Sequence, residues 1–303
     1  MTTKPSDAPW ADGPFPLIAT PSKRPGLSNP GHFYVRAATG MTHAHNAIIR
    51  GLNAIVLQAP NVPSSSGKGY KPRDVKDLLS FVQSWIKMLN HHHSVEETYI
   101  FPEMAKLSGD PDLLEGPWHQ HRLFQGGVDR LLAYTTATRP DEYRWAGGMR
   151  EAIDSFSKHL TDHLYAEIGV FLGFRHLDSE GYKKVWIGAH AVASESGNLR
   201  QKLDMLYDVF PCVYGCSDRT YEGGHSFPML HWTLPYLVNY WFAVGNGAWR
   251  FNPSDFWFDE VDVISATLLL ILLKHASTGS APYSGEEPWV KVGEITCESL
   301  KEL

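Results

Sequence analysis

Cysteine is scarce in this sequence, with three residues among 303, and their number is odd. Such a count excludes a disulfide framework and indicates a reducing compartment. Cys212 and Cys216 lie close together in "PCVYGC", but a structural zinc site needs four ligands. Only the distant Cys297 or scattered histidines could complete one, so we do not expect zinc at this pair.

Long apolar runs are also missing. The most apolar stretch, "VISATLLLILL" at residues 263–273, is shorter than the roughly 20 residues that cross a bilayer, which favours a buried core helix. The first 26 residues are rich in proline and polar residues and lack the basic region and apolar segment of a secretory signal. We therefore expect a cytoplasmic location and no membrane partner.

The charge pattern and the motifs exclude other classes of protein. The formal net charge is −6, and no block of like charges forms a nucleic-acid footprint, so nucleic acid is not an expected partner. The sequence contains no GxSxG elbow, no P-loop and no GxGxxG after a predicted strand. Hydrolase, nucleotide-binding and Rossmann interpretations therefore have no support.

Histidine, in contrast, is abundant. The chain has 15 histidines, and nine of them lie between residues 43 and 163. These nine are His43, His45, His91, His92, His93, His119, His121, His159 and His163. Clustering on this scale requires a structural or chemical reason.

Four long helical patterns span the same part of the chain. They cover about 33–58, 73–107 with an interruption near Pro102, 112–136, and 140–174, and turn-forming residues separate them. Short connections between four helices predict an all-α, up-down-up-down four-helix bundle. We expect residues 1–30 to form a disordered or wrapped arm, 31–176 the bundle, and 177–303 an aromatic-rich helical region that packs on it.

The apolar stripes of these helices continue into polar residues. The second helix carries Leu78, Val82, Trp85, Leu89, His92, Glu96 and Tyr99 at spacings of three or four, and the fourth carries Ile153, Phe156, Leu160, His163, Glu167 and Val170. The third presents Leu114, Trp118, His121, Gln125, Val128 and Leu132, and the first presents His45, Ile49, Leu52 and Val56. Each helix thus brings a histidine to its inward face.

Buried imidazoles and carboxylates are costly unless something replaces the lost water. For any one of them, a surface position or a hydrogen-bonded core position is the ordinary explanation. Four helices in phase, two of them with a glutamate four residues after a histidine, favour metal binding instead. Imidazole and carboxylate ligands suit iron, manganese or zinc, and carboxylates from two helices can bridge two ions, so we infer a dinuclear centre.

Four motifs resemble hemerythrin-like proteins with the HHE cation-binding domain, especially the larger fungal members. The motifs are "HAHNAIIRGLNAIVLQAP", "HHHSVEETYIFPEM", "HQHRLFQGGVDRL" and "HLTDHLYAEIGVFLGF", in that order over about residues 32–176. The resemblance implies a non-haem di-iron centre. Its ligands would be His45, His92, Glu96, His121, His163 and Glu167, with the two glutamates bridging.

The sequence departs from oxygen-carrying hemerythrins at two positions. Gln125 stands where those proteins have a second histidine on the third helix, and Glu167 follows His163 by four residues, where they have an aspartate after five. One iron would then lack a nitrogen ligand, which water, substrate or a spare histidine could replace. His43 and His159 are candidates for an extra ligand, and Gln125 and His93 could be an extra ligand or a hydrogen-bond partner of one. His91, His93 and His119 fall on other faces, where solvent exposure or hydrogen bonding to a ligand is expected.

Two functions remain open from the sequence. In the first, the centre binds or handles O2, NO or a peroxide in a sensing, storage or redox role. In the second, it is an O2-dependent oxidoreductase that oxidises a small organic molecule held between the bundle and the C-terminal region, beside Gln125. The sequence identifies no catalytic residue beyond the metal ligands, and it does not decide whether the protein is an enzyme.

Overall fold

The computed structural model describes residues 11–24, 26–27, 32–195, 199–225, 227–228 and 244–254. All of them belong to one unit, Met1–Phe256. The aromatic segment at 229–243 and the apolar run at 263–273 lie outside the described residues, as does Cys297.

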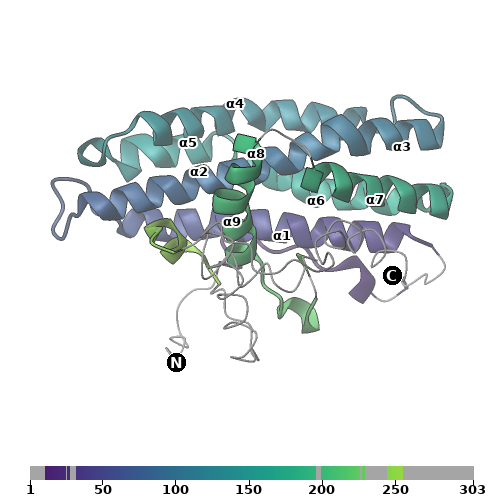
Figure 1. The fold of residues 1–303 in the computed structure, drawn as a ribbon, viewed down its shortest axis with the longest axis horizontal. Helices are drawn as coiled ribbons and strands as arrows, with labels where there is room; N and C mark the ends of the chain where they lie inside the picture. Colours follow the sequence, from purple (N-terminus) through teal and green to yellow (C-terminus); the bar gives the residue numbers. More distant parts are fainter. Residues whose placement is uncertain are drawn as a thin grey trace, which may run out of the picture. The chain divides into compact units, whose positions relative to one another are not determined.

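The described part of the chain is all-α and contains no strand, as predicted. Its long helices are α1 (Tyr34–Gln58), α2 (Pro72–Val95), α4 (Glu115–Ala137) and α6 (Ser157–Gly173). They run alongside one another with successive reversals of direction (Figure 1). The short helix α3 (Phe101–Ser108) continues the chain after α2. Another short helix, α5 (Arg150–Asp154), directly precedes α6. This arrangement is the predicted four-helix bundle.

Local chemistry explains where these helices begin and end. Pro72 occupies the first turn of α2, where its missing N–H costs nothing. Gly109 ends α3 in a left-handed conformation (φ 74°), which glycine adopts without strain. Between α2 and α3 the chain forms a π-helical turn, Glu96–Ile100, ahead of Pro102.

Two predicted helical patterns differ from the structure. The fourth does not run unbroken from 140 to 174, because 3₁₀ and π turns occupy Pro140–Glu142 and Trp145–Met149 and the helix breaks at Ser155 and Phe156. The predicted inward stripe of α4 also drifts out of phase, since Trp118 is 40% exposed. The buried positions of α4 are instead Pro117, His121, Phe124, Gly127, Val128, Leu131 and Thr135.

In the described residues, three further α-helices follow the bundle: α7 (Ser179–Glu195), α8 (Leu199–Asp204) and α9 (Phe210–Cys216). A π turn, Met205–Val209, joins α8 to α9. Figure 1 shows α8 and α9 running across α1 and α2. Buried residues of α7 and α9 share one hydrophobic core with the bundle. Cys212 and Cys216 lie within α9. The domain boundaries at residues 30 and 176 stay a prediction.

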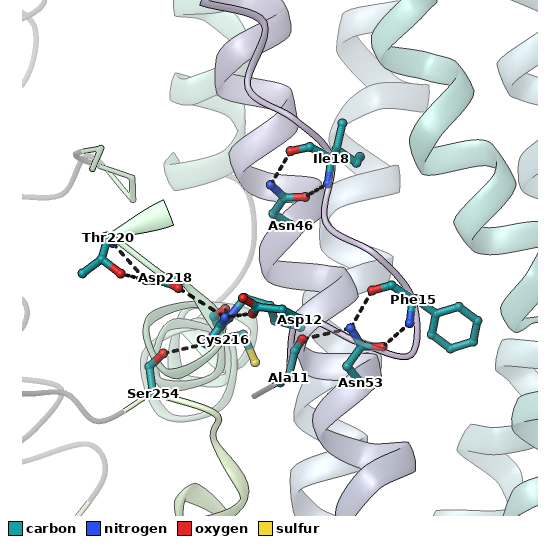
Figure 2. A network of polar contacts seen from close by, with 11 residues as sticks. Ala11, Asp12, Phe15, Ile18, Asn46, Asn53, Cys216, Asp218, Thr220 and Ser254 are labelled. Carbon is teal, nitrogen blue, oxygen red and sulfur yellow. Dashed lines mark hydrogen bonds and ion pairs between the residues drawn. The ribbon is translucent and has the colours of Figure 1, made fainter. Parts of the chain in front are cut away.

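The described part of the N-terminal segment lies along α1, where two asparagine side chains bind its backbone. Asn46 accepts a hydrogen bond from the Ile18 amide (2.8 Å) and donates one to the Ile18 carbonyl (2.9 Å). Seven residues further along the same helix, Asn53 binds backbone atoms of Ala11 and Phe15 (Figure 2). These amides satisfy backbone groups that would otherwise be buried without partners.

Arg50 connects this segment to two others. Its side chain is fully buried and donates to the Cys216 carbonyl (3.0 Å) and the Ser254 hydroxyl (3.1 Å), and it pairs with the carboxylates of Asp12 and Asp218. Figure 2 shows these partners meeting beside α1. The ion pairs and hydrogen bonds together compensate for burial of the guanidinium charge.

Remaining turns complete the described chain. The 3₁₀ turns are Pro21–Lys23, Ala59–Asn61, Phe174–His176, Tyr221–Gly223 and Gly247–Phe251. The last of these buries Trp249 and Phe251 against the bundle. Among the described residues, no helix is both long and apolar enough to cross a membrane.

Candidate metal centre

Side chains from four helices converge inside the bundle. His45 comes from α1, His92 and His93 from the end of α2, and Glu96 from the first position of the π turn. His121 comes from α4, and His163 and Glu167 from α6. Apart from His92, which is 16% exposed, each of these side chains is buried. All six residues of the predicted ligand set are therefore brought to one place.

The donor atoms form two facing groups. Nε2 of His45 lies 3.1 Å from Nε2 of His92, and Nε2 of His92 lies 3.0 Å from Oε1 of Glu96. On the other side, Nε2 of His121 lies 3.1 Å from Nε2 of His163. Neighbouring ligands of a metal with bonds of about 2.0–2.1 Å are separated by roughly this distance. Both groups thus have the spacing of atoms that share an ion.

The two glutamates lie between these groups. Glu96 directs Oε1 toward His92 and places Oε2 3.7 Å from Nε2 of His121. Glu167 places Oε2 3.3 Å from Nε2 of His45 and 3.9 Å from Nε2 of His163. Each carboxylate therefore reaches both groups, as a bridging ligand must.

Three histidines are oriented by hydrogen bonds at the other ring nitrogen. Nδ1 of His45 bonds the Leu164 carbonyl (2.9 Å), Nδ1 of His121 bonds Oε1 of Glu97 (2.6 Å), and Nδ1 of His163 bonds Oε1 of Gln120 (3.0 Å). Because these acceptors require a proton on Nδ1, each Nε2 presents a lone pair to the centre. This is the tautomer that a metal ligand needs.

The carboxylates have no hydrogen-bond donor of their own. Neither oxygen of Glu96 or Glu167 makes a hydrogen bond within the described residues, although both side chains are buried. Burial raises the pKa of both carboxyls well above the usual range, and repulsion from Glu97 adds to the effect at Glu96. An unsatisfied buried carboxylate is strongly unfavourable, so a cation between the two groups would satisfy it.

Burial also disfavours the charged form of the histidines in the cluster. Burial lowers the pKa of His45, His93 and His163 well below 6.5 and that of His92 to about 4. For His45 and His93, repulsion from neighbouring imidazoles adds to desolvation. At neutral pH these rings are neutral, which is the form that binds metal ions. The donor set fits a pair of first-row transition metals.

The π turn at Glu96 places this carboxylate. The Phe101 amide donates to the Glu96 carbonyl five residues back, which widens the helix at the point where the ligands cluster. Such single π turns occur frequently at functional sites. The helix pattern read from the sequence predicts an interruption here only through Pro102.

The additional residues predicted near the site have different positions. His159 and His119 are exposed, and His91 is half-buried, so none of these joins the cluster. His43 stacks on His225 with ring centroids 3.9 Å apart, away from the donor group. Burial lowers the pKa of His43 to about 4. The prediction of His159 as an extra ligand was therefore wrong.

Gln125 also lies outside the cluster. It is half-buried, and its amide donates to Oδ1 of Asp129 (2.9 Å), an exposed neighbour on α4. The prediction that Gln125 adjoins the centre was wrong because α4 turns Phe124, not Gln125, inward. Two residues that the sequence analysis missed do contact ligands, namely Glu97 and Gln120. Their only sequence signal is proximity to the histidine motifs.

His93 was expected on another face of its helix, yet it lies in the cluster. Its donor atoms group with those of Glu96, His121 and His163, all within 4.8 Å of one another. A second group of donors within the same limit consists of His45, His92 and Glu96.

Two surface pockets of about 330–340 Å³ lie elsewhere on the described chain. One is lined by Gln58, Asn61, Val62, Pro63, Asp74, Arg250 and Phe251, and the other by Tyr99, Glu103, Lys106, Leu107, Gly181, Lys184 and Val185. Neither includes a residue of the His/Glu cluster. The thiols of Cys212 and Cys216 lie 3.9 Å apart, are buried and form no disulfide. Within the described residues they belong to no group of metal-ligand type.

Comparison with known proteins agrees with this geometry. The model of the hemerythrin HHE cation binding domain matches residues 37–174, which include the whole His/Glu cluster. The dimeric xanthone biosynthesis cluster protein R11 of Cryptosporiopsis sp. (strain 8999) is 35% identical over 249 residues, covering 81% of this chain and 89% of that protein. No solved structure gives a significant match to the chain.

Proposed function

The chain belongs to the hemerythrin HHE cation-binding family, and from that premise we propose that its centre holds two iron ions and handles O2 or a related small molecule such as NO or a peroxide. The role is sensing, storage or redox chemistry. The single observation that carries the proposal is the pair of unsatisfied, buried carboxylates between two groups of imidazoles. Manganese or zinc would fit the same donor types, so the identity of the metal belongs to the proposal.

The chain's own residues have distinct tasks in this role. Glu96 and Glu167 would hold the metal ions through their carboxylates, and the histidines would supply neutral nitrogen ligands. Leu164, Glu97 and Gln120 fix the ring orientations through Nδ1. Burial of the centre excludes bulk water. The iron pair would supply electrons and open coordination positions for a small ligand.

A second candidate function is supported by the relative. The name of protein R11 assigns it to a dimeric xanthone biosynthesis cluster. An O2-dependent oxidation of a small organic molecule is the corresponding role for this chain, with the organic substrate bound near the centre. The described residues that follow the bundle would then contribute to the substrate site.

Metal content tests the common part of both proposals. We expect the purified full chain to carry about two irons, following the dinuclear donor arrangement. His92→Ala and Glu96→Ala should lose most of this iron, because each removes a donor from the cluster. His119→Ala, which changes an exposed histidine on the same helix as His121, is the matched control and should keep it. Full iron retention in both ligand variants would refute the assignment.

Admission of O2 to the anaerobically reduced protein separates the two functions. A carrier or sensor gives an absorption change that reverses when O2 is removed. An oxidase gives a transient change and consumes O2, faster when its organic substrate is present. An iron-loaded protein that gives no spectral change with O2, NO or peroxide would contradict both proposals.

A further inference from the structure

We propose that His93 is a metal ligand and adds a third imidazole to the half of the centre formed by His121 and His163. This inference rests on the proposed function, because it assigns another ligand to the same metal pair. The family resemblance implies a ligand set without His93, and the helix pattern places it on another face. The argument therefore depends on the position of the ring itself.

The His93 ring lies among the other imidazoles. Its centroid is 4.3 Å from that of His121, 5.5 Å from that of His163 and 5.3 Å from that of His92. One of its nitrogens is within 4.8 Å of donor atoms of Glu96, His121 and His163. An ion shared by the latter three residues would thus be within reach of His93.

Both nitrogens of His93 are without a hydrogen-bond partner among the described residues, and the side chain is 5% exposed. A neutral imidazole has one N–H donor and one acceptor nitrogen, and burial of both without partners is costly. His121 and His163 differ, since their Nδ1 atoms are satisfied by Glu97 and Gln120. A metal ion would satisfy the acceptor nitrogen of His93.

The geometry of α2 allows His92 and His93 to serve the same centre. At 3.6 residues per turn, Glu96 points about 40° from His92 and about 60° from His93, on opposite sides. Glu96 therefore lies between the two histidines, and the π turn that begins at Glu96 widens the helix there. The buried line of α2 and this turn passes through His93: Val82, Ile86, Leu89, His93, Glu96 and Ile100.

His93 also replaces the nitrogen donor that α4 fails to provide. Gln125 directs its amide to Asp129 at the surface, so α4 contributes His121 alone. With His93 as a ligand, one half of the centre has three imidazoles and the other has His45 and His92. The alternative is that His93 only packs against Phe124, whose ring centroid is 5.1 Å away.

Anaerobic titration of the metal-free full chain with Fe²⁺ tests the assignment. The wild-type chain should bind two ions. His93→Gln should bind one ion with unchanged affinity and the other at least tenfold more weakly, because one half loses a ligand. His91→Ala changes the half-buried neighbour in the same histidine triplet and should bind both ions like the wild type.

A second variant guards against loss of the fold. His93→Phe keeps an aromatic ring beside Phe124, and circular dichroism reports its helix content. If His93 only packs, this variant binds two ions normally; if it is a ligand, the second ion is weakened as in His93→Gln. If either folded variant binds both Fe²⁺ ions as tightly as the wild type, His93 is not a ligand and the proposed function still stands. A wild-type chain that binds no ion overturns the proposed function itself.

Discussion

Replacement of Glu167 by leucine should stabilise the metal-free protein and abolish its stabilisation by metal. The Glu167 side chain is fully buried, and neither oxygen makes a hydrogen bond within the described residues. Burial and the nearby Glu96 hold its pKa well above the usual range. Without a metal ion the residue is thus a cost to the fold, and leucine removes that cost.

The size of the stability change follows from the cost of burying the Glu167 carboxyl without a hydrogen-bond partner. A buried polar group without a partner costs about 1–3 kcal/mol. Leucine differs in shape, and repacking offsets part of the gain, so we expect a net increase of about 1–2 kcal/mol in the free energy of unfolding. For a unit of this size, that corresponds to a rise of roughly 2–8 °C in Tm. Metal at about 1,000 times its Kd would stabilise the wild type by about 4 kcal/mol, and the variant by much less.

Thermal unfolding with chelator and with added Fe²⁺ measures both effects. Glu103→Leu is a suitable control because Glu103 lies on α3, pairs with Lys106 at the surface and is remote from the donor set. The control should change stability by about 0.5 kcal/mol or less and retain the metal-dependent gain. The reasoning is refuted if Glu167→Leu destabilises the metal-free chain by several kcal/mol, or if the variant still gains full stability from iron.

Three further substitutions test other parts of the fold. His43→Phe should flatten the pH dependence of the free energy of unfolding, measured with urea. Folding lowers the pKa of His43 from 6.5 to about 4, so the wild type loses about 2–3 kcal/mol of stability as pH falls from 6.5 to 4. The variant lacks the imidazole and avoids this loss. Equal pH dependence of stability in the wild type and the variant would contradict this prediction. Arg50→Ala should cost about 3–5 kcal/mol and speed proteolysis of residues 11–18, because buried partners lose their donor; a loss below 1 kcal/mol would argue against the network. Gly51→Ala should cost about 1–3 kcal/mol, since its Cβ would lie 2.4 Å from Cδ1 of Trp85. Gly126→Ala, with no atom nearer than 3.9 Å, is its control and should be neutral or stabilising.

Much of the bundle is visible in the sequence because burial imposes a periodic pattern. The first helix, predicted at 33–58, spans Tyr34–Gln58, and its inward histidine is His45. The spacing of four between His163 and Glu167 likewise placed both in the interior. Residues that must share a helix face for chemistry repeat with the same period as the core, which is why the pattern exposed them.

The sequence-based predictions are wrong where more than one face of a helix is buried or where a helix is irregular. Helix α2 packs against α1, α4, α7 and α9, so a single stripe could not show that His93 is more buried than His92. In α4 the buried line shifts at Phe124, which displaced Gln125 from the predicted interior. The break at Ser155 and Phe156 carries neither proline nor glycine. Tertiary contacts decide these details, and one sequence does not reveal them.

The proposed function requires two metal ions beside the carboxylates of Glu96 and Glu167. Anomalous X-ray diffraction from crystals of the iron-loaded full chain, recorded on both sides of the iron absorption edge, tests it most directly. We predict two iron peaks inside the cluster, one beside His45 and His92 and one beside His121 and His163. Crystals of iron-loaded protein with no peak among these side chains, or with iron bound only at the surface, would contradict the account.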